Sequence, residues 1–189
     1  MTERPFDHDP SVADFTVPKH VYLAARPGAS FGYIATSVLV LEVTDVSNPR
    51  LLLLQRAAND ERDPNKWEPP GGACDDDDES ILHAAARELW EEAGLDAARI
   101  GGHIGDPHFF TIAVGSELLK VCQFNFAVQV KFPAGHLPEV RLDPQEHQCF
   151  VWATEAEIRA KKVGDVHLDF TRDEVERTVL LAFQHRMEA

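Results

Sequence analysis

The sequence predicts a mixed β-sheet flanked by helices, of the α/β or α+β class. Runs that favour strands and helices follow one another in the order β, β, α, several β, α, which is typical of such a sheet. The length of 189 residues suits one domain. With 44% hydrophobic and 26% charged residues, the chain has enough apolar side chains to bury a core, so we expect it to fold.

Two strands open the predicted sheet. Residues 33–43 (YIATSVLVLEV) are rich in β-branched side chains and too short for an amphipathic helix, which favours a buried strand. After a turn, residues 50–56 (RLLLLQR) are expected to pair with it as a hairpin. Four leucines alone are equally compatible with a helix, but the short length favours a strand. From residue 57 through the Trp-Glu-Pro-Pro-Gly-Gly run we expect only loop.

Residues 80–93 form the clearest predicted helix. Apolar residues recur at spacings of three and four from Leu82 to Ala93, Ser80 suits the N-cap, and Gly94 suits the position just after the helix. Further strands are expected at residues 108–114, 118–130 and 149–152, and a closing helix at residues 172–187.

Residues 1–32 are predicted to be an N-terminal extension of a domain that spans residues 33–189. Four prolines lie among polar residues in this stretch, so we expect it to drape over the rest of the molecule. We expect the extension to build part of a substrate pocket or a homodimer interface, since substrate selection often lies in loops and added segments.

The charge balance narrows the classes of partner. Thirty-two acids against eighteen lysines and arginines give a net charge of −14, which opposes binding to polymeric nucleic acid and to anionic membranes. A small phosphate compound would need divalent cations between it and this protein. No apolar stretch approaches the ~18 residues of a membrane helix, and the start lacks a signal-peptide pattern. Three widely spaced cysteines suggest no disulfide framework, so we expect a cytoplasmic protein.

Three carboxylates share one face of the predicted helix. Glu88, Glu91 and Glu92 lie at i, i+3 and i+4, where like charges repel and weaken a helix. A hard divalent cation would reverse that repulsion, and oxygen ligands suit magnesium or manganese. The alternative is a solvated acidic face in which Arg87 pairs with Glu91. The preceding Pro-Gly-Gly run favours the first reading, because it lets the backbone approach a helix or a phosphate closely.

These residues resemble the Nudix hydrolases. Their signature is Gly, five residues, Glu, seven residues, then Arg-Glu-apolar-x-Glu-Glu-x-Gly-apolar, and the chain matches it from Glu79 through Leu95. Six residues, not five, separate Gly72 from Glu79, which indicates a one-residue insertion. The resemblance covers roughly residues 33–187, including the Glu-His-x-x-x-x-Trp run at 146–152.

The resemblance implies an α/β/α sandwich with a mixed sheet that hydrolyses a nucleoside diphosphate linked to another moiety, using Mg²⁺ or Mn²⁺. It implies that Glu88, Glu91 and Glu92 hold the metal, and that Glu88 or an acid outside the motif deprotonates the attacking water. Arg87 would orient these carboxylates and Glu79 would support them. Bound cations would also neutralise charge on the phosphoryl oxygens.

Further site residues carry two interpretations each. Arg56 suits either a substrate phosphate or an ordinary strand edge, and Glu146 either an extra metal ligand or base or a surface acid. Phe110 suits base stacking or the core, as do Trp67, Phe109 and Trp152. Gly71 and Gly72 are expected beside the substrate.

Two other functions remain as alternatives. One is a Nudix-fold nucleotide sensor or interaction module without turnover, although every carboxylate of the motif is present. The other is a serine hydrolase at Ser30 in Gly-Ala-Ser-Phe-Gly, which lacks the strand before and the helix after that such a nucleophile needs. The substrate stays open between ADP-ribose, nucleotide sugars, dinucleoside polyphosphates and nucleoside triphosphates, because neither the proline nor the tyrosine that marks some subfamilies follows the motif.

Overall fold

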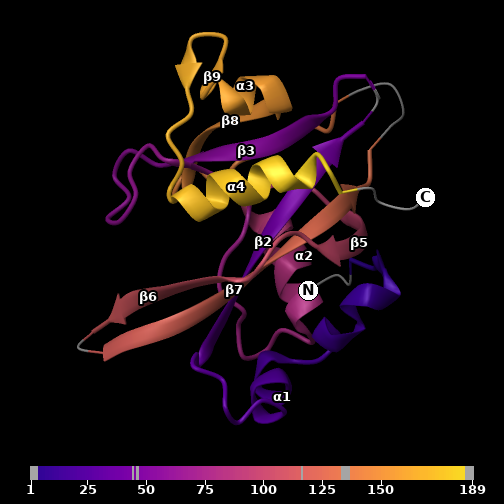
Figure 1. Cartoon of the computed structure of the whole chain (residues 1–189), viewed down its shortest axis with the longest axis vertical. Coiled ribbons are helices and arrows are strands. Elements are labelled where there is room, and N and C mark those ends of the chain that lie inside the picture. Colours follow the sequence, from indigo (N-terminus) through magenta and orange to yellow (C-terminus); the bar gives the residue numbers. More distant parts are fainter. Residues whose placement is uncertain (1–3, 44, 46, 116, 133–136, 186–189) are drawn as a thin grey trace.

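A computed structural model describes residues 4–43, 45, 47–115, 117–132 and 137–185. One sheet crosses the molecule in the order β1-β5-β7-β2-β3-β4, with β6 added to β7 and β8 added to β3 (Figure 1). The pairs β1–β5 and β2–β7 are parallel and the other pairs of this sheet are antiparallel, so the sheet is mixed. Its strands are β1 (Asp7–His8), β2 (Tyr33–Glu42), β3 (Arg50–Arg56), β4 (Trp67–Glu68), β5 (Ala97–His103), β6 (His108–Val114), β7 (Glu117–Val130) and β8 (His147–Thr154).

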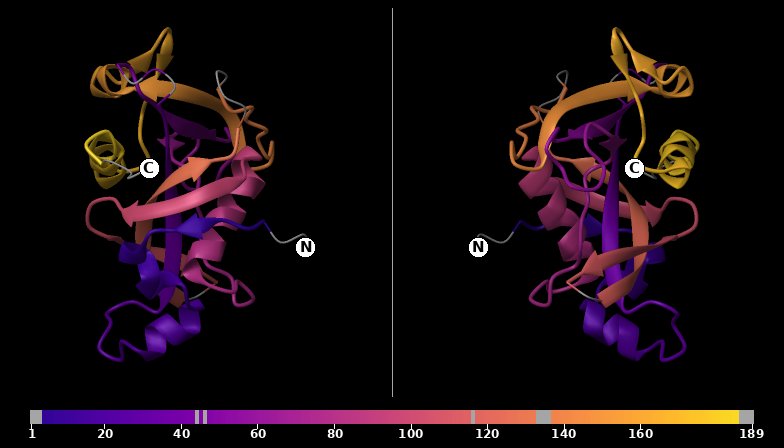
Figure 2. Two further views of the ribbon diagram at one scale, coloured as in Figure 1. Left: turned by 90° about the vertical axis from the view of Figure 1, so that its right-hand side faces the viewer. Right: turned by 90° about the vertical axis from the view of Figure 1, so that its left-hand side faces the viewer.

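Helices cover both faces of the sheet. Because side chains alternate along a strand, Val38 of β2 packs with α2 (Ile81–Ala93), whereas Leu39 packs with α4 (Asp173–Ala182). Figure 2 shows the sheet edge-on between these two helices. The predicted α/β/α sandwich is therefore confirmed. The short α3 (Glu155–Arg159) and the hairpin of β9 (Lys162–Val163) and β10 (Val166–His167) complete the C-terminal part.

The predicted elements are largely where the pattern placed them. The hairpin of β2 and β3 is confirmed by the antiparallel pairing of Leu41 with Leu51. Helix α2 begins after Ser80, whose hydroxyl accepts the His83 backbone N–H, and ends at Gly94 with a φ of 67°. The closing helix is shorter than expected, since α4 ends at Ala182; the end of the predicted range, residues 186 and 187, lies outside the described residues.

Two expectations about loops need correction. The run that begins at Trp67 is not loop throughout, because Trp67 and Glu68 form β4, which pairs with β3. Trp67 is fully buried, so the strand is held by its side chain despite the prolines that follow. Strand β5 was not predicted, because its AARIGGH sequence contains two glycines and little β-branched character.

The N-terminal segment packs into the main core. Strand β1 pairs with β5, followed by the 3₁₀ helix η1 (Pro10–Phe15) and by α1 (Lys19–Ala24). Phe15 and Tyr22 belong to the same buried cluster as α2. None of the helices in the described ranges is long and apolar enough to cross a membrane.

Candidate active site

The loop before α2 lies against the carboxylates of that helix. The Gly71 backbone N–H donates to Glu92 Oε2 at 2.8 Å. A Cβ at Gly72 would lie 2.6 Å from the Glu88 carboxylate, and one at Gly71 would lie 2.2 Å from the Thr36 carbonyl oxygen. Position 71 therefore requires glycine, because a side chain there would meet the backbone of β2. At position 72 a side chain fits only if the Glu88 carboxylate moves.

Arg87 links the carboxylates of α2 to the glycine loop at the exposed end of this site. Its guanidinium donates to Glu88 Oε1 at 2.8 Å and to Glu91 Oε2 at 2.9 Å, and also to the Ala73 carbonyl oxygen at 2.9 Å. These bonds fix both carboxylates relative to the glycine loop. Arg87 therefore does more than form a surface ion pair with Glu91. Its guanidinium also contacts the glycine loop and the largely buried Glu88 carboxylate.

Asp78, and not Glu79, makes the supporting contact expected for Glu79. Asp78 accepts from Arg87 Nε at 3.0 Å and from Arg87 Nη2 at 2.9 Å, and its side chain is 9% exposed. The Glu79 side chain is 74% exposed and lies 3.7 Å from His83 Nε2. Asp78 is separated from Gly72 by five residues, so the extra residue falls between this acid and the helix.

Burial raises the pKa of two of these carboxyl groups. The pKa of Glu88 rises to about 7, because desolvation outweighs the opposing effect of Arg87. The pKa of Glu92, which is fully enclosed, rises well above its usual value despite the hydrogen bond from Gly71. The nearby charge of Glu146 contributes to both increases. A divalent cation would favour the ionised forms of these groups.

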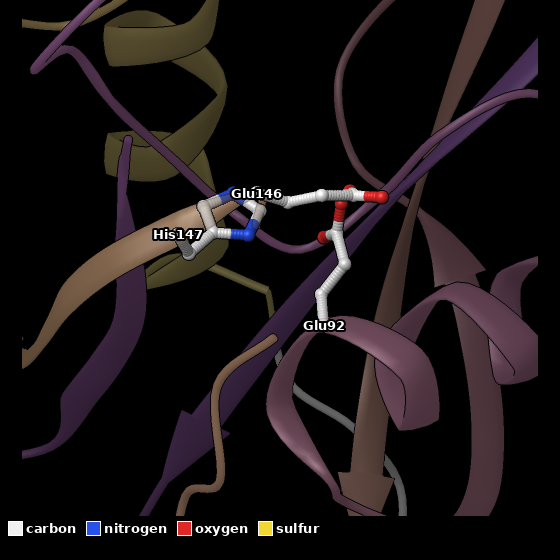
Figure 3. Close-up of side chains that lie close together, drawn as sticks. All are labelled: Glu92, Glu146 and His147. Carbon is white, nitrogen blue, oxygen red and sulfur yellow. The ribbon is translucent and has the colours of Figure 1, made fainter. Parts of the chain in front are cut away.

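Strand β8 and the turn before it bring two more side chains to α2. The Glu146 carbonyl oxygen accepts the Ala57 N–H at 2.8 Å, which holds the turn before β8 against the end of β3. Ligand atoms of Glu92, Glu146 and His147 all lie within 4.8 Å of one another (Figure 3). This is a grouping that can hold a metal ion, and it places Glu146 beside the helix as expected for an acid outside the motif.

His147 was missed by sequence reasoning. Its only signal was its position next to Glu146. In the structure Arg56 pairs with His147 while Gln55 pairs with Cys149, so β8 has an irregularity at Gln148. The His147 side chain is buried and that of the unpaired Gln148 is exposed.

A pocket of about 190 Å³ lies beside the glycine loop. Arg56, Gly71, Gly72 and Phe110, the residues expected to bind substrate, all line it. Arg172 also lines it, with its guanidinium 4.4 Å from the centre of the Phe110 ring. Further lining residues include Arg62, Asp63, Glu68 and Gln123.

The charge of Arg56 is already matched by two carboxylates. Its guanidinium forms ion pairs with Asp60 and with Glu68, which lower the pKa of Asp60 and contribute to lowering that of Glu68. The other arginines at the pocket, Arg62 and Arg172, were not identified from the sequence. Arg62 lies in a polar loop and Arg172 directly before α4, and neither belongs to a recognisable motif, so only the fold shows that they line the pocket.

The remaining alternatives for side chains are also placed by the structure. Trp67 is fully buried, and its indole N–H donates to the His167 carbonyl oxygen at 3.0 Å, so it belongs to the core. Phe109 is 62% exposed and lies against Phe31. Ser30 follows α1 and precedes β2, which is the reverse of the strand-to-helix turn that a serine nucleophile needs.

Comparison with known proteins identifies the family. The model of the NUDIX domain matches residues 34–173. The chain belongs to the Nudix hydrolase family. The match covers the sheet from β2 to β8, the motif helix and the start of α4, and so includes every part of the site described above.

Curated relatives are similar to only part of this Nudix chain. It is 32% identical over 129 residues to the m7GpppN-mRNA hydrolase NUDT17 of Danio rerio, across 60% of this chain and 40% of that protein. It is 41% identical over 56 residues to NUDT17 of Bos taurus, across 30% of this chain and 18% of that protein. The chain thus aligns with less than half the length of these relatives.

Solved structures share the fold over most of the Nudix chain. The MutT protein from Methanosarcina mazei is 25% identical with a TM-score of 0.51, covering 80% of this chain and 92% of its own. The NUDIX domain of Shewanella oneidensis NrtR, complexed with ADP ribose, is 16% identical with a TM-score of 0.58, covering 87% and 96%. A C. elegans Ap4A hydrolase binary complex is 21% identical with a TM-score of 0.51, covering 81% and 96%.

Proposed function

We propose that this protein is a divalent-metal-dependent pyrophosphohydrolase. It cleaves the diphosphate linkage of a nucleoside diphosphate joined to another moiety. The observation that carries the proposal is the convergence of the buried Glu88 and Glu92 carboxylates, Glu146 and a glycine loop at the edge of a pocket. Buried carboxylates that can hold a metal ion, next to a pocket that can admit a phosphate group, suit metal-assisted attack of water on phosphorus.

The carboxylates of α2 and of the turn before β8 have two roles in this proposal, metal binding and proton transfer. Glu92 and Glu146 would hold Mg²⁺ or Mn²⁺ with Glu88 and Glu91, and the ion would neutralise phosphoryl charge and acidify a water. Glu88 or Glu146 would accept the proton from the attacking water. A bound cation would favour the ionised form of either group, which is the form that can accept a proton.

The pocket supports a nucleotide substrate. Phe110 offers an aromatic face for a base, and the Arg172 guanidinium stacked on it adds positive charge. Gly71 and Gly72 line the pocket without side chains that would fill it, and Arg62 lies at the pocket wall. Arg56 is paired with two carboxylates, so we propose that its main role is to stabilise the wall of the pocket. It would contact a substrate phosphate while keeping these ion pairs.

The relatives support a class of substrate. The m7GpppN-mRNA hydrolase, the Ap4A hydrolase and the ADP-ribose complex all involve a nucleoside joined through linked phosphates. With a net charge of −14, we propose a small nucleotide or a cap-like dinucleotide for this protein and not a polymer. A cytoplasmic location and a homodimer remain predictions.

The test is product analysis over a panel of candidate substrates. The panel contains ADP-ribose, diadenosine polyphosphates, nucleotide sugars, oxidised nucleoside triphosphates and a methylated cap dinucleotide, each with Mg²⁺, with Mn²⁺ or with a chelator. We expect at least one member to be cleaved at a phosphoric anhydride bond, only with metal present. If no member is cleaved while a nucleotide still binds, the sensor alternative replaces this proposal.

A further inference from the structure

The His147 side chain is buried without a hydrogen-bond partner within normal distance in the described part of the chain. It is 2% exposed, and neither ring nitrogen has a hydrogen-bond partner among the described residues. Its backbone N–H, in contrast, donates to the Asp143 carbonyl oxygen at 2.9 Å, so the residue is firmly placed. An unsatisfied buried polar group costs about 1–3 kcal/mol, and such a group in a native fold indicates a missing partner.

The ring lies among three acidic side chains. Glu68 Oε1 is 3.8 Å from His147 Nε2, and Glu68 is itself fixed by its ion pair with Arg56. Glu92 and Glu146 complete the surroundings, with ligand atoms within 4.8 Å of one another and of the ring. Figure 3 shows the imidazole and the two glutamates converging from β8, the turn before it and α2.

We infer that His147 is a nitrogen ligand of the metal site, together with Glu92 and Glu146. Ligand atoms that each lie ~2.0–2.2 Å from one ion are themselves ~3–4 Å apart, so a small closure of this cluster around the ion suffices. A histidine ligand commonly gives the proton of its other nitrogen to a carboxylate, and Glu68 stands on the Nε2 side of the ring. That arrangement leaves Nδ1 to the metal.

This ligand changes which metal the site selects. Magnesium is bound almost wholly by oxygen, whereas imidazole is a common ligand of transition metals, among which Mn²⁺ is the one that also suits carboxylate ligands. The inference rests on the proposed metal-dependent function and deepens it, because the site prefers Mn²⁺ to Mg²⁺ and its selectivity comes from a residue outside the helix motif.

Electron spin echo spectroscopy of the Mn²⁺-loaded protein tests the inference without relying on turnover. Nitrogen bound to Mn²⁺ gives a ¹⁴N modulation, which we expect in the wild type and which changes when all histidines carry ¹⁵N. We expect His147→Gln to lose the modulation and to raise the Kd for Mn²⁺ about tenfold or more. The Kd for Mg²⁺ should change much less.

His108→Gln is the matched control. His108 is also buried, but its Nε2 is hydrogen-bonded to Thr178 Oγ1 at 2.8 Å, on the side of α4. This variant should keep the modulation and the Mn²⁺ affinity. His147→Asn is a second test variant should the glutamine variant misfold, and the isotope experiment needs no variant at all.

The outcomes separate this inference from the proposed function. Tight Mn²⁺ binding with no nitrogen modulation in the wild type overturns the His147 assignment and leaves the carboxylate site standing. If neither Mn²⁺ nor Mg²⁺ binds, or if Glu92→Gln binds both metals as the wild type does, the proposed metal-dependent function fails.

Discussion

Glu92 is the residue on which the site depends most directly. Glu92→Gln removes one carboxylate charge while its side-chain oxygen can still accept the Gly71 N–H, so the loop should stay in place. We expect kcat to fall by about 10²-fold or more, as when a strong electrostatic stabiliser is removed. The turnover rate is measured at a saturating metal concentration, and a thermal melt of the same variant shows whether it is folded. Wild-type kcat in a folded variant would remove Glu92 from the metal site.

Asp78 and Glu79 form a natural pair for a second comparison. Asp78→Asn weakens two hydrogen bonds to Arg87, which loosens the hold on Glu88 and Glu91, so we expect kcat to fall about tenfold. Glu79→Gln changes an exposed carboxyl and should leave kcat within about twofold. The reverse order of effects would restore the role that the motif spacing assigns to Glu79.

Glu88 gives the metal-free protein a recognisable pH dependence. Its folded pKa of about 7 lies above the unfolded value of 4.5, so the folded state holds this proton more tightly. This tighter proton binding adds at most about 3 kcal/mol to the free energy of unfolding. The added stability is present below pH 4.5 and is lost as the pH rises to about 7. The free energy of unfolding is measured in urea with a chelator between pH 4.5 and 7. We expect it to fall less steeply with pH in Glu88→Gln than in the wild type. An unchanged slope would contradict the assignment.

At the scale of elements, the glycine loop and α2 act as one unit. In Gly72→Ala the new methyl group would meet the Glu88 carboxylate at 2.6 Å, so either the loop or the carboxylate must move. We expect a loss of about 1–3 kcal/mol in the free energy of unfolding and reduced turnover. Gly28→Ala is the control, because nothing lies within 4 Å of a Cβ there. Equal stability of the two variants would show that the contact carries no strain.

The elements that could be predicted are those whose own residues encode them. Helix α2 has its cap, its apolar spacing and its terminal glycine in one short stretch, and β3 is a single apolar run. Strand β5 and the two-residue β4 were missed because long-range pairing, and not local propensity, makes them strands.

The same division holds for the site. The charges of α2 are visible in the sequence, since one helix places them. The contribution of His147 depends on an irregular strand pairing, and that of Arg172 on where α4 begins, so neither has a local signature. Glu79 was predicted because seven residues separate it from Arg87, whereas Asp78 satisfies the five-residue spacing from Gly72. The sequence cannot say which of the two contacts Arg87, and in the structure it is Asp78.

At the scale of the whole molecule, the N-terminal segment contributes to stability. Phe15 is 7% exposed, and its ring lies within 4.8 to 5.6 Å of the rings of Tyr22, Phe124 and Phe126. We expect Phe15→Ala to cost about 3–5 kcal/mol of unfolding free energy. His20→Ala, on the exposed side of the neighbouring helix, should be nearly neutral. Denaturant unfolding of both variants measures this, and an equal midpoint would mean that the segment is only loosely attached.

The pairing of β3 with β8 also determines how early during synthesis the site can form. Arg56 and His147 are neighbours in the sheet although 90 residues of chain separate them, so this contact closes a very long loop. Such contacts form slowly, and on a ribosome they must wait for the later partner to emerge. A nascent chain that ends before residue 146 already carries all three motif glutamates, yet it lacks Glu146 and His147. The proposed metal cluster would therefore be complete only after Glu146 and His147 have been translated, well after the motif helix has left the ribosome.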